Sequence, residues 1–191
     1  SVMDKHLFVG LGNPGPQYAG NRHNVGFMVI DAFAQRWGCQ LNQKKFNGLC
    51  GTAQCHNTPV VCLKPQTFMN VSGRSVAPAQ RFFGLESARL LVVHDELDLP
   101  FGRIRLKCDG GHGGHNGLRS IMAETGSKSF MRLRMGIGRP PGGSVSNFVL
   151  SNFAQGEEID WLPDLIDRAV SALEQVLSDG LASAMTRVNA T

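Results

Sequence analysis

The side chains best suited to acid–base chemistry stand between an apolar run that predicts a strand and a periodic segment that predicts a helix. His23 belongs to Asn21-Arg22-His23-Asn24-Val25-Gly26, which follows the turn Gly10-Leu11-Gly12-Asn13-Pro14-Gly15. Histidine exchanges a proton near neutral pH, and asparagine positions or polarises a substrate without changing its own charge. His23 is therefore a candidate base and Asn13 a candidate polarising group. A loop histidine is more often structural than catalytic, so this hypothesis depends on partners elsewhere in the chain.

Three carboxylates form a second candidate group. They lie in His94-Asp95-Glu96-Leu97-Asp98, at the end of a short apolar run that predicts a buried strand. An open α/β sheet presents side chains to ligands at the carboxyl ends of its strands. In the catalytic hypothesis, Asp95 fixes the tautomer of His23 and stabilises its imidazolium, while asparagines bind the substrate carbonyl and the developing oxyanion. In the structural alternative, Asp95 caps the following turn and the asparagines only satisfy turn backbone.

A third candidate is the glycine-rich segment Gly110-Gly111-His112-Gly113-Gly114-His115-Asn116-Gly117, whose glycines let a ligand approach the main chain. A P-loop would need a following lysine, and the turn at residues 10–15 is one residue too short for a dinucleotide fingerprint. Zinc bound by His112, His115 and Cys108 would lack a carboxylate ligand or a helical histidine pair. A serine hydrolase would need a Gly-x-Ser-x-Gly elbow, which the sequence lacks. The remaining hypothesis is a metal-free histidine with acids and amides.

Alternating strands and helices are expected to position these groups. Strands are predicted over residues 6–11, 45–56, 59–64, 89–93, 102–107 and 130–137. Helices are predicted over residues 24–37, 71–83, 118–124 and 161–177. This order predicts a single-domain three-layer α/β/α fold with a twisted mixed β-sheet, whose antiparallel part is the hairpin at residues 45–64. Asn24 is the expected N-cap of the first helix, so the helix dipole disfavours imidazolium at His23 unless an acid compensates.

Length and composition limit the class of protein. With 191 residues and 42% hydrophobic content, the chain fits one folded domain over residues 1–191. No apolar run is long enough to cross a bilayer, and Ser1 and Val2, ahead of Met3, are interpreted as residues added before the natural start. The odd number of cysteines, five, indicates reduced thiols in a cytoplasmic protein. Three of them are expected to pack in the core: Cys50, Cys55 and Cys62.

The net charge of +4 is informative because part of it is concentrated in two segments. These segments alternate basic and apolar residues, so as strands they would project their charges to one side of a sheet. Their basic residues are Arg103, Arg105, Lys107, Arg132, Arg134 and Arg139. Such a face favours a phosphate-rich substrate over the small substrates of a carboxylesterase or an aminopeptidase-like hydrolase.

Taken together, the motifs resemble those of bacterial peptidyl-tRNA hydrolases. Besides the two motifs around His23, they are Lys64-Pro65-Gln66-Thr67-Phe68-Met69-Asn70-Val71-Ser72-Gly73, His94-Asp95-Glu96-Leu97-Asp98, residues 111–118 and Arg132-Leu133-Arg134-Met135-Gly136-Ile137-Gly138-Arg139-Pro140. The resemblance extends over residues 7–153. It implies a monomeric cytoplasmic esterase that binds tRNA and cleaves the bond between a peptide and the terminal adenosine of peptidyl-tRNA. This reaction recycles tRNA from abandoned translation, a form of ribosome rescue, and by the same resemblance needs no metal or other cofactor and no membrane.

The resemblance also implies roles for individual residues. His23 matches the catalytic base, Asp95 the carboxylate bonded to it, and Asn13 and Asn116 amides of the catalytic site. The matching substrate-binding positions are Tyr18, Phe68, Met69, Asn70, Gly113 and His115. The matching tRNA phosphate-binding positions are Arg105, Lys107 and Arg134, and Arg105 keeps the charge of a lysine with a different geometry. Residues 110–117 match a loop, and residues 142–155 a lid, over the cleft.

The main rival hypothesis is a noncatalytic RNA-binding module on the same scaffold, because a fold alone does not guarantee activity. The joint presence of all four candidate catalytic residues argues for the enzyme. Cleavage of an N-blocked aminoacyl-tRNA would distinguish the two.

Overall fold

The first apolar run of the sequence forms the central strand of the sheet. In the computed structural model, which describes residues 5–190, β1 spans His6–Gly10 and the side chains of Leu7, Phe8 and Val9 are fully buried. β1 pairs in parallel with β4 on one side and with β5 on the other, and β5 pairs in parallel with β7. Because successive side chains point to opposite faces, Phe8 and Val9 enter two separate cores.

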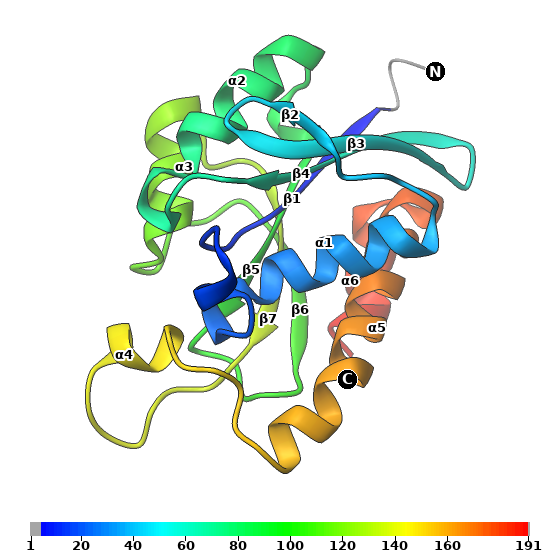
Figure 1. The fold of residues 1–191 in the computed structure, drawn as a ribbon. Coiled ribbons are helices and arrows are strands. Elements are labelled where there is room, and N and C mark those ends of the chain that lie inside the picture. The colour runs from blue at the N-terminus through cyan, green and yellow to red at the C-terminus, as the bar shows by residue number, and fades with distance from the viewer. Residues whose placement is uncertain (1–4, 191) are drawn as a thin grey trace.

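Within residues 5–190, seven strands form one mixed sheet in the order β2-β3-β4-β1-β5-β7-β6 (Figure 1). The strands other than β1 are β2 Gln43–Lys45, β3 Gly48–Cys55, β4 Thr58–Pro65, β5 Leu90–Glu96, β6 Ile104–Cys108 and β7 Met131–Gly136. Antiparallel pairing joins β2, β3 and β4 at one edge, but it also joins β6 to β7 at the other. The expectation that the hairpin alone supplies antiparallel pairing is therefore wrong. Only a short loop joins β5 to β6, so β6 starts near the carboxyl end of β5. It therefore runs in the opposite direction to β5 and β7.

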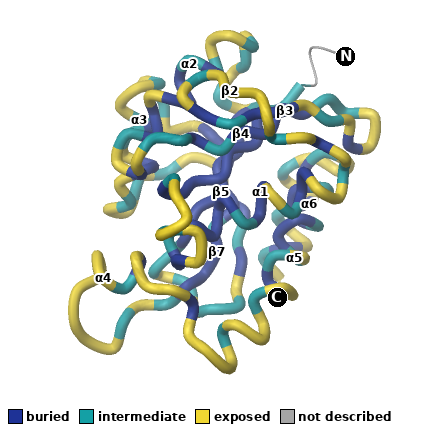
Figure 2. Tube along the Cα trace, in the orientation of Figure 1, coloured by how far each residue is buried: buried dark blue, intermediate teal, exposed yellow. Residues whose placement is uncertain are grey.

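Helices cover both faces of this sheet and complete the three layers. On the face that Phe8 enters lie α1 Val25–Arg36, α5 Glu157–Asp179 and α6 Leu181–Val188. On the face that Val9 enters lie α2 Gly73–Phe83 and α3 Asn116–Thr125. Figure 2 shows buried residues concentrated in the central strands and exposed residues mainly on the outer helices and loops. The predicted three-layer α/β/α fold is confirmed.

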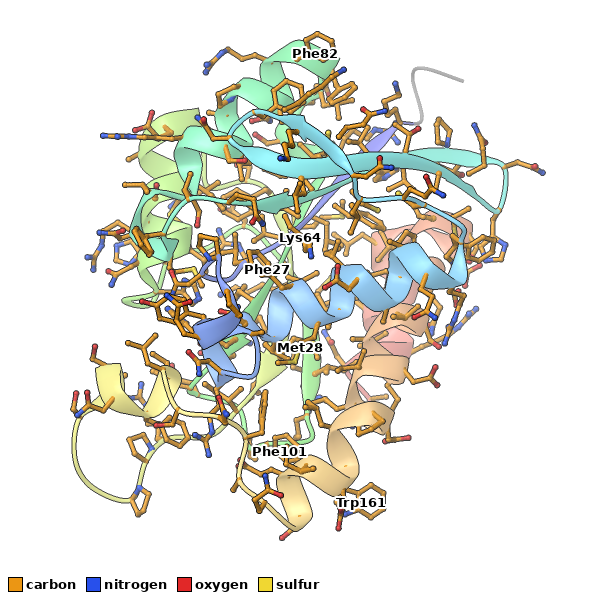
Figure 3. All side chains as sticks on the ribbon, in the orientation of Figure 1. Phe27, Met28, Lys64, Phe82, Phe101 and Trp161 are labelled. Atoms are coloured by element: carbon orange, nitrogen blue, oxygen red, sulfur yellow. The ribbon has the colours of Figure 1, made fainter. Side chains whose placement is uncertain are left out.

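Lys64 of β4 holds α1 against the sheet. Its ammonium lies 2.7 Å from the Oδ1 atom of Asp31 and 5.4 Å from the centre of the Phe27 ring. Figure 3 shows Lys64 close to Phe27, which Met28 follows in the same helix. A carboxylate and an aromatic face together favour one position for this partly buried cation. The contact fixes the first turns of α1, directly after His23.

The strand predicted over residues 45–56 begins only at Gly48, and Lys45 ends a separate short strand, β2. β2 ends at Lys45 and β3 begins at Gly48, and the residues between them, Phe46 and Asn47, have φ angles of 57° and 51°. Positive φ at both central residues is the geometry of a two-residue hairpin turn. The sequence did not reveal this turn because Phe46 has a side chain typical of strands.

Two further helices differ from the prediction at the C-terminal side. α4 Val145–Val149 was not predicted, and Gly180, with a φ of 83°, separates α6 from α5. Short helices escape detection because they contain too few turns for a periodic pattern. The helix expected from residue 71 begins at Gly73, after the 3-10 turn Met69–Val71.

The predictions for the cysteines, the first two residues and membrane-spanning segments can be compared with the structure. Cys50, Cys55 and Cys62 are buried, as predicted. Ser1 and Val2 lie outside the described residues. Among the helices of residues 5–190, none has both the length and the apolar character needed to cross a membrane.

Candidate active site

Two glycines let the start of α1 pack directly on the sheet. A Cβ atom at Gly10 would lie 2.2 Å from the carbonyl oxygen of Gly26, and one at Gly26 would lie 2.4 Å from that of Val93. Neither position can carry a side chain without moving the backbone. The 3-10 turn Arg22–Asn24 that precedes α1 therefore lies against β5, and this brings His23 to the carboxyl end of that strand.

Asp95 is the centre of the site. Its buried carboxylate lies 2.7 Å from Nδ1 of His23 and 2.8 Å from Nε2 of His115. Burial alone would raise the pKa of this carboxyl, but the charges and hydrogen bonds of the two imidazoles outweigh burial and hold its pKa well below the usual range. Because an ionised carboxylate only accepts hydrogen bonds, Nδ1 of His23 carries the proton and Nε2 carries the lone pair.

The basicity of His23 depends on the same contact. Burial disfavours the imidazolium and lowers the pKa of His23, but the negative charge and the hydrogen bond of Asp95 raise it more, so its pKa lies above the ordinary value. Asp95 is thus the compensating acid that a histidine at a helix N-terminus requires. The ring is suited to accept a proton near neutral pH and to hold it during a reaction.

Asn13 is held by the side chain of Asn24 on one side and by the main chain of Met69 on the other. Its main-chain N–H donates to Oδ1 of Asn24, and Nδ2 of Asn24 donates back to the carbonyl of Asn13, both at 2.9 Å. The main-chain N–H of Met69 donates to Oδ1 of Asn13 at 2.7 Å. The acceptor of the Asn13 amide is therefore occupied, and its N–H donors remain for a ligand. The side chain of Asn24 fastens this turn and does not cap α1, which corrects the predicted N-cap hydrogen bond.

These groups line a cavity of about 500 Å³. The structure brings almost all predicted catalytic and substrate-binding residues to its wall: Asn13, His23, Phe68, Met69, Asn70, Asp95, Gly113, His115 and Asn116. Tyr18 is the exception, because Gly15, at a φ of 110°, turns the chain and Tyr18 lies half-buried in the 3-10 turn Pro16–Tyr18, outside the cavity wall. The prediction that Tyr18 forms this wall is therefore not supported.

The segment predicted as a lid, residues 142–155, contributes Val145, Ser146, Val149 and Leu150 to the same cavity. Arg22 ties this segment to the turn that carries His23. Its guanidinium stacks 4.1 Å from the centre of the Phe148 ring and pairs with Glu158 at 2.9 Å. No local pattern indicated a role for this buried arginine, apart from its place next to His23.

A second pocket of about 280 Å³ adjoins the cavity and shares with it His94, Glu96, Asp98, His112 and Gly113. Lys107 and Arg134 line it. The register of β6 and β7 pairs Arg105 with Arg134 and Lys107 with Arg132, so these side chains emerge on one face, as the alternation predicted. Arg105 is not part of the pocket wall, and one of its guanidinium nitrogens donates to the carbonyl of Ile104.

Arg132 has a different role from the other basic residues of these strands. It is buried and donates hydrogen bonds to the carbonyl oxygens of Gly110, Gly111 and Lys128 at 2.6 to 2.8 Å. Its guanidinium therefore holds the glycine-rich loop in place. Arg132 thus lies on the predicted basic face and lines the second pocket, but its guanidinium is buried against the loop and adds no open charge to that face.

Within residues 5–190, His23, Asp95 and His115 form the one group with metal-ligand geometry. In this structure both imidazoles are hydrogen-bonded to the Asp95 carboxylate. The zinc alternative of His112, His115 and Cys108 is not assembled, since Cys108 lies exposed on β6.

A base, an acid and amides in one cavity beside a cationic pocket are typical of an α/β enzyme that acts on an anionic substrate. Comparison with known proteins identifies the family of this enzyme. The family model for peptidyl-tRNA hydrolase matches residues 7–191. The peptidyl-tRNA hydrolase of Citrifermentans bemidjiense is 54% identical over 188 residues, which are 98% of this chain and 100% of that protein. The peptidyl-tRNA hydrolase of Geobacter sulfurreducens is 50% identical over 187 residues, 98% of this chain and 96% of that protein.

Solved structures agree with this result. The crystal structure of peptidyl-tRNA hydrolase from Acinetobacter baumannii matches with a TM-score of 0.92 at 42% identity, covering 98% of this chain and 96% of that one. The chain belongs to the peptidyl-tRNA hydrolase family.

Proposed function

We propose that this chain hydrolyses the ester bond between a peptide and the terminal adenosine of peptidyl-tRNA, with His23 as the base and without a metal. The observation that carries the mechanism is the 2.7 Å contact between His23 and the buried Asp95, in a cavity lined by amide side chains. Family membership supports the enzyme over a noncatalytic RNA-binding module.

The reaction begins with a water molecule at Nε2 of His23. The ring takes a proton from this water as its oxygen attacks the ester carbonyl carbon, and Asp95 stabilises the imidazolium that forms. An N–H group of Asn13 donates to the developing oxyanion. As the bond from the carbonyl carbon to the ribose oxygen breaks, the imidazolium returns its proton to that oxygen. The products are the peptide acid and tRNA with a free terminal hydroxyl.

These groups are sufficient for an activated ester. A positioned base and an oxyanion donor each contribute on the order of 10² to 10³-fold in rate. An aminoacyl ester is more reactive than an amide, so the mechanism does not need a covalent nucleophile.

Free aminoacyl-tRNA has to be spared, and the amides of the cavity support this discrimination. The oxygen of the Asn13 amide is occupied by the Met69 N–H, and that of Asn116 by a guanidinium N–H of Arg119 at 3.1 Å. Both amides therefore offer N–H donors, which bind the carbonyl groups of a peptide. A charged α-amino group would lose its hydration shell against these donors and is disfavoured.

The adjoining pocket fits a tRNA phosphate. Lys107 and Arg134 line it, and Glu96 positions Arg134 through a contact of 2.9 Å to its Nε. We assign this pocket to a phosphate near the acceptor end and place Arg105 outside it as a source of positive potential.

The direct test compares N-acetyl-aminoacyl-tRNA with free aminoacyl-tRNA in the presence of a chelator. Rapid cleavage of the blocked substrate alone is expected. Loss of cleavage with chelator, or equal cleavage of both substrates, would contradict the proposal. We also propose that the protein is a monomer, and sedimentation of the same protein tests this.

A further inference from the structure

His115 uses both of its ring nitrogens inside the protein. Nδ1 accepts hydrogen bonds from the main-chain N–H groups of Gly117 and Leu118, at 3.1 and 3.3 Å, and so caps α3. Nε2 lies 2.8 Å from Oδ1 of Asp95. A nitrogen that accepts from two N–H groups cannot carry a proton, so the proton of the ring is on Nε2 and points at the carboxylate. The N-terminus of α3 thus selects the tautomer of His115.

This geometry leaves no polar atom of His115 for a substrate. Its ring lines the cavity, 5.3 Å from the ring of His23 between centroids, but it can touch a ligand only through carbon atoms. The substrate-binding role implied by the family resemblance therefore does not explain why a histidine stands here.

We infer that His115 is a positioning residue which transmits the orientation of α3 to Asp95 and, by donating a second hydrogen bond to the carboxylate, moderates the negative charge that His23 experiences. This inference rests on the proposed role of His23 as the base. The Oδ1 atom of Asp95 is fixed by His115, which leaves Oδ2 aligned with Nδ1 of His23.

The direction of the effect follows from the position of the proton. The N–H of His115 presents its positive end to the same carboxylate that stabilises the His23 imidazolium. Without it, Asp95 attracts a proton on His23 more strongly, so the pKa of His23 rises. Since neutral His23 is the active form, the acidic limb of the profile of kcat/KM against pH moves to higher pH.

Other charged or titratable groups also line this cavity: His94, Glu96, Asp98, His112 and Arg139. Arg139 pairs with Asp98 at 2.7 Å and Arg134 with Glu96 at 2.9 Å, so these carboxylates are neutralised locally. Burial and the neighbouring His115 lower the pKa of His94 to about 4, outside the range of the assay. The remaining group, His112, provides the control.

The test uses His115→Asn. Asparagine at an N-cap still accepts from the first turn of α3, so the helix keeps its cap, but its side chain is too short to reach Asp95. We expect the acidic midpoint of kcat/KM to rise by about half to one pH unit, KM to change less than about twofold, and activity to recover largely at high pH. His112→Asn is the matched control, because Nδ1 of His112 also accepts a backbone N–H, from Gly114 at 2.9 Å. Its midpoint should not move.

An unchanged midpoint in His115→Asn would overturn the inference, and so would a rise in KM that is the same at every pH, which would indicate substrate binding. Nitrogen-15 correlation spectra of the unmodified protein test the tautomer without any variant; a proton on Nδ1 of His115 would also overturn it. Full activity of His23→Ala would instead refute the proposed base, so the two failures can be told apart.

Discussion

Nδ1 of His23 lies 2.7 Å from Oδ2 of Asp95, although 72 positions separate the two residues in the sequence. The close packing of Gly10 against Gly26 brings the turn before α1 to the end of β5 and so creates this contact. The acid–base chemistry of the site therefore depends on backbone packing as much as on the two side chains.

Asp95→Asn should lower kcat by about 10² to 10⁴-fold, because the amide neither stabilises imidazolium nor selects the Nδ1–H tautomer. It should also move the acidic limb of the pH profile to lower pH. Burial, which lowers the pKa of His23, then acts without the carboxylate that raises it. The measurement is the dependence of kcat on pH, and a profile that coincides with that of the parent would show that Asp95 is only a turn residue.

Replacing both Lys107 and Arg134 by Ala should weaken the use of full-length peptidyl-tRNA at low salt. Each lost phosphate contact releases about one counterion fewer, so the slope of log kcat/KM against log salt should flatten by about one to two units. A minimal substrate with only an acylated adenosine should be cleaved at the parental rate. Arg187→Ala is the control, since Arg187 pairs with Asp179 on the opposite face of the sheet. Equal losses on both substrates would exclude the phosphate pocket.

Arg132→Ala should destabilise the fold by about 2–4 kcal/mol, because a buried guanidinium and three backbone acceptors lose their hydrogen bonds. Denaturant unfolding measures this change. The exposed Lys128→Ala should stay within about 0.5 kcal/mol of the parent. A loss below about 1 kcal/mol in Arg132→Ala would contradict the assigned role of this arginine in holding the loop.

His94 should make the protein sensitive to acid. Its Nδ1 donates to the carbonyl of Asp95, and burial followed by the neighbouring His115 lowers its pKa from 6.5 to about 4. The folded state therefore binds this proton less readily than the unfolded state, and stability present above pH 6.5 is lost as the pH falls towards 4. The loss is on the order of 3 kcal/mol. His94→Gln should flatten unfolding free energy over this range, and an unchanged slope would contradict the assignment.

The sequence predicted the central strands, the three layers and the residues around His23, because apolar runs and turn motifs are local signals. It did not predict that Asn24 would fasten the backbone of Asn13, or that Arg132 would hold a loop. Both contacts depend on the distance between segments, which no local pattern encodes.

The same reasoning explains why Tyr18 lies outside the cavity wall and why α4 was not predicted. Tyr18 is close to Asn13 in sequence, yet Gly15 turns the chain away from the cavity. Residues 145–149 are too few for a periodic signal, and only contacts such as Arg22 with Phe148 place them over the site.

Single-turnover hydrolysis of N-acetyl-aminoacyl-tRNA by His23→Ala, compared with the parent at equal tRNA binding, tests the central claim most directly. His23 lies in a turn outside the main core, so the variant should fold and should bind tRNA as the parent does. Its rate should fall by at least about 10²-fold, the typical contribution of a general base. A rate within about threefold of the parent, with tRNA binding intact, would show that another group activates the water and would contradict the mechanism.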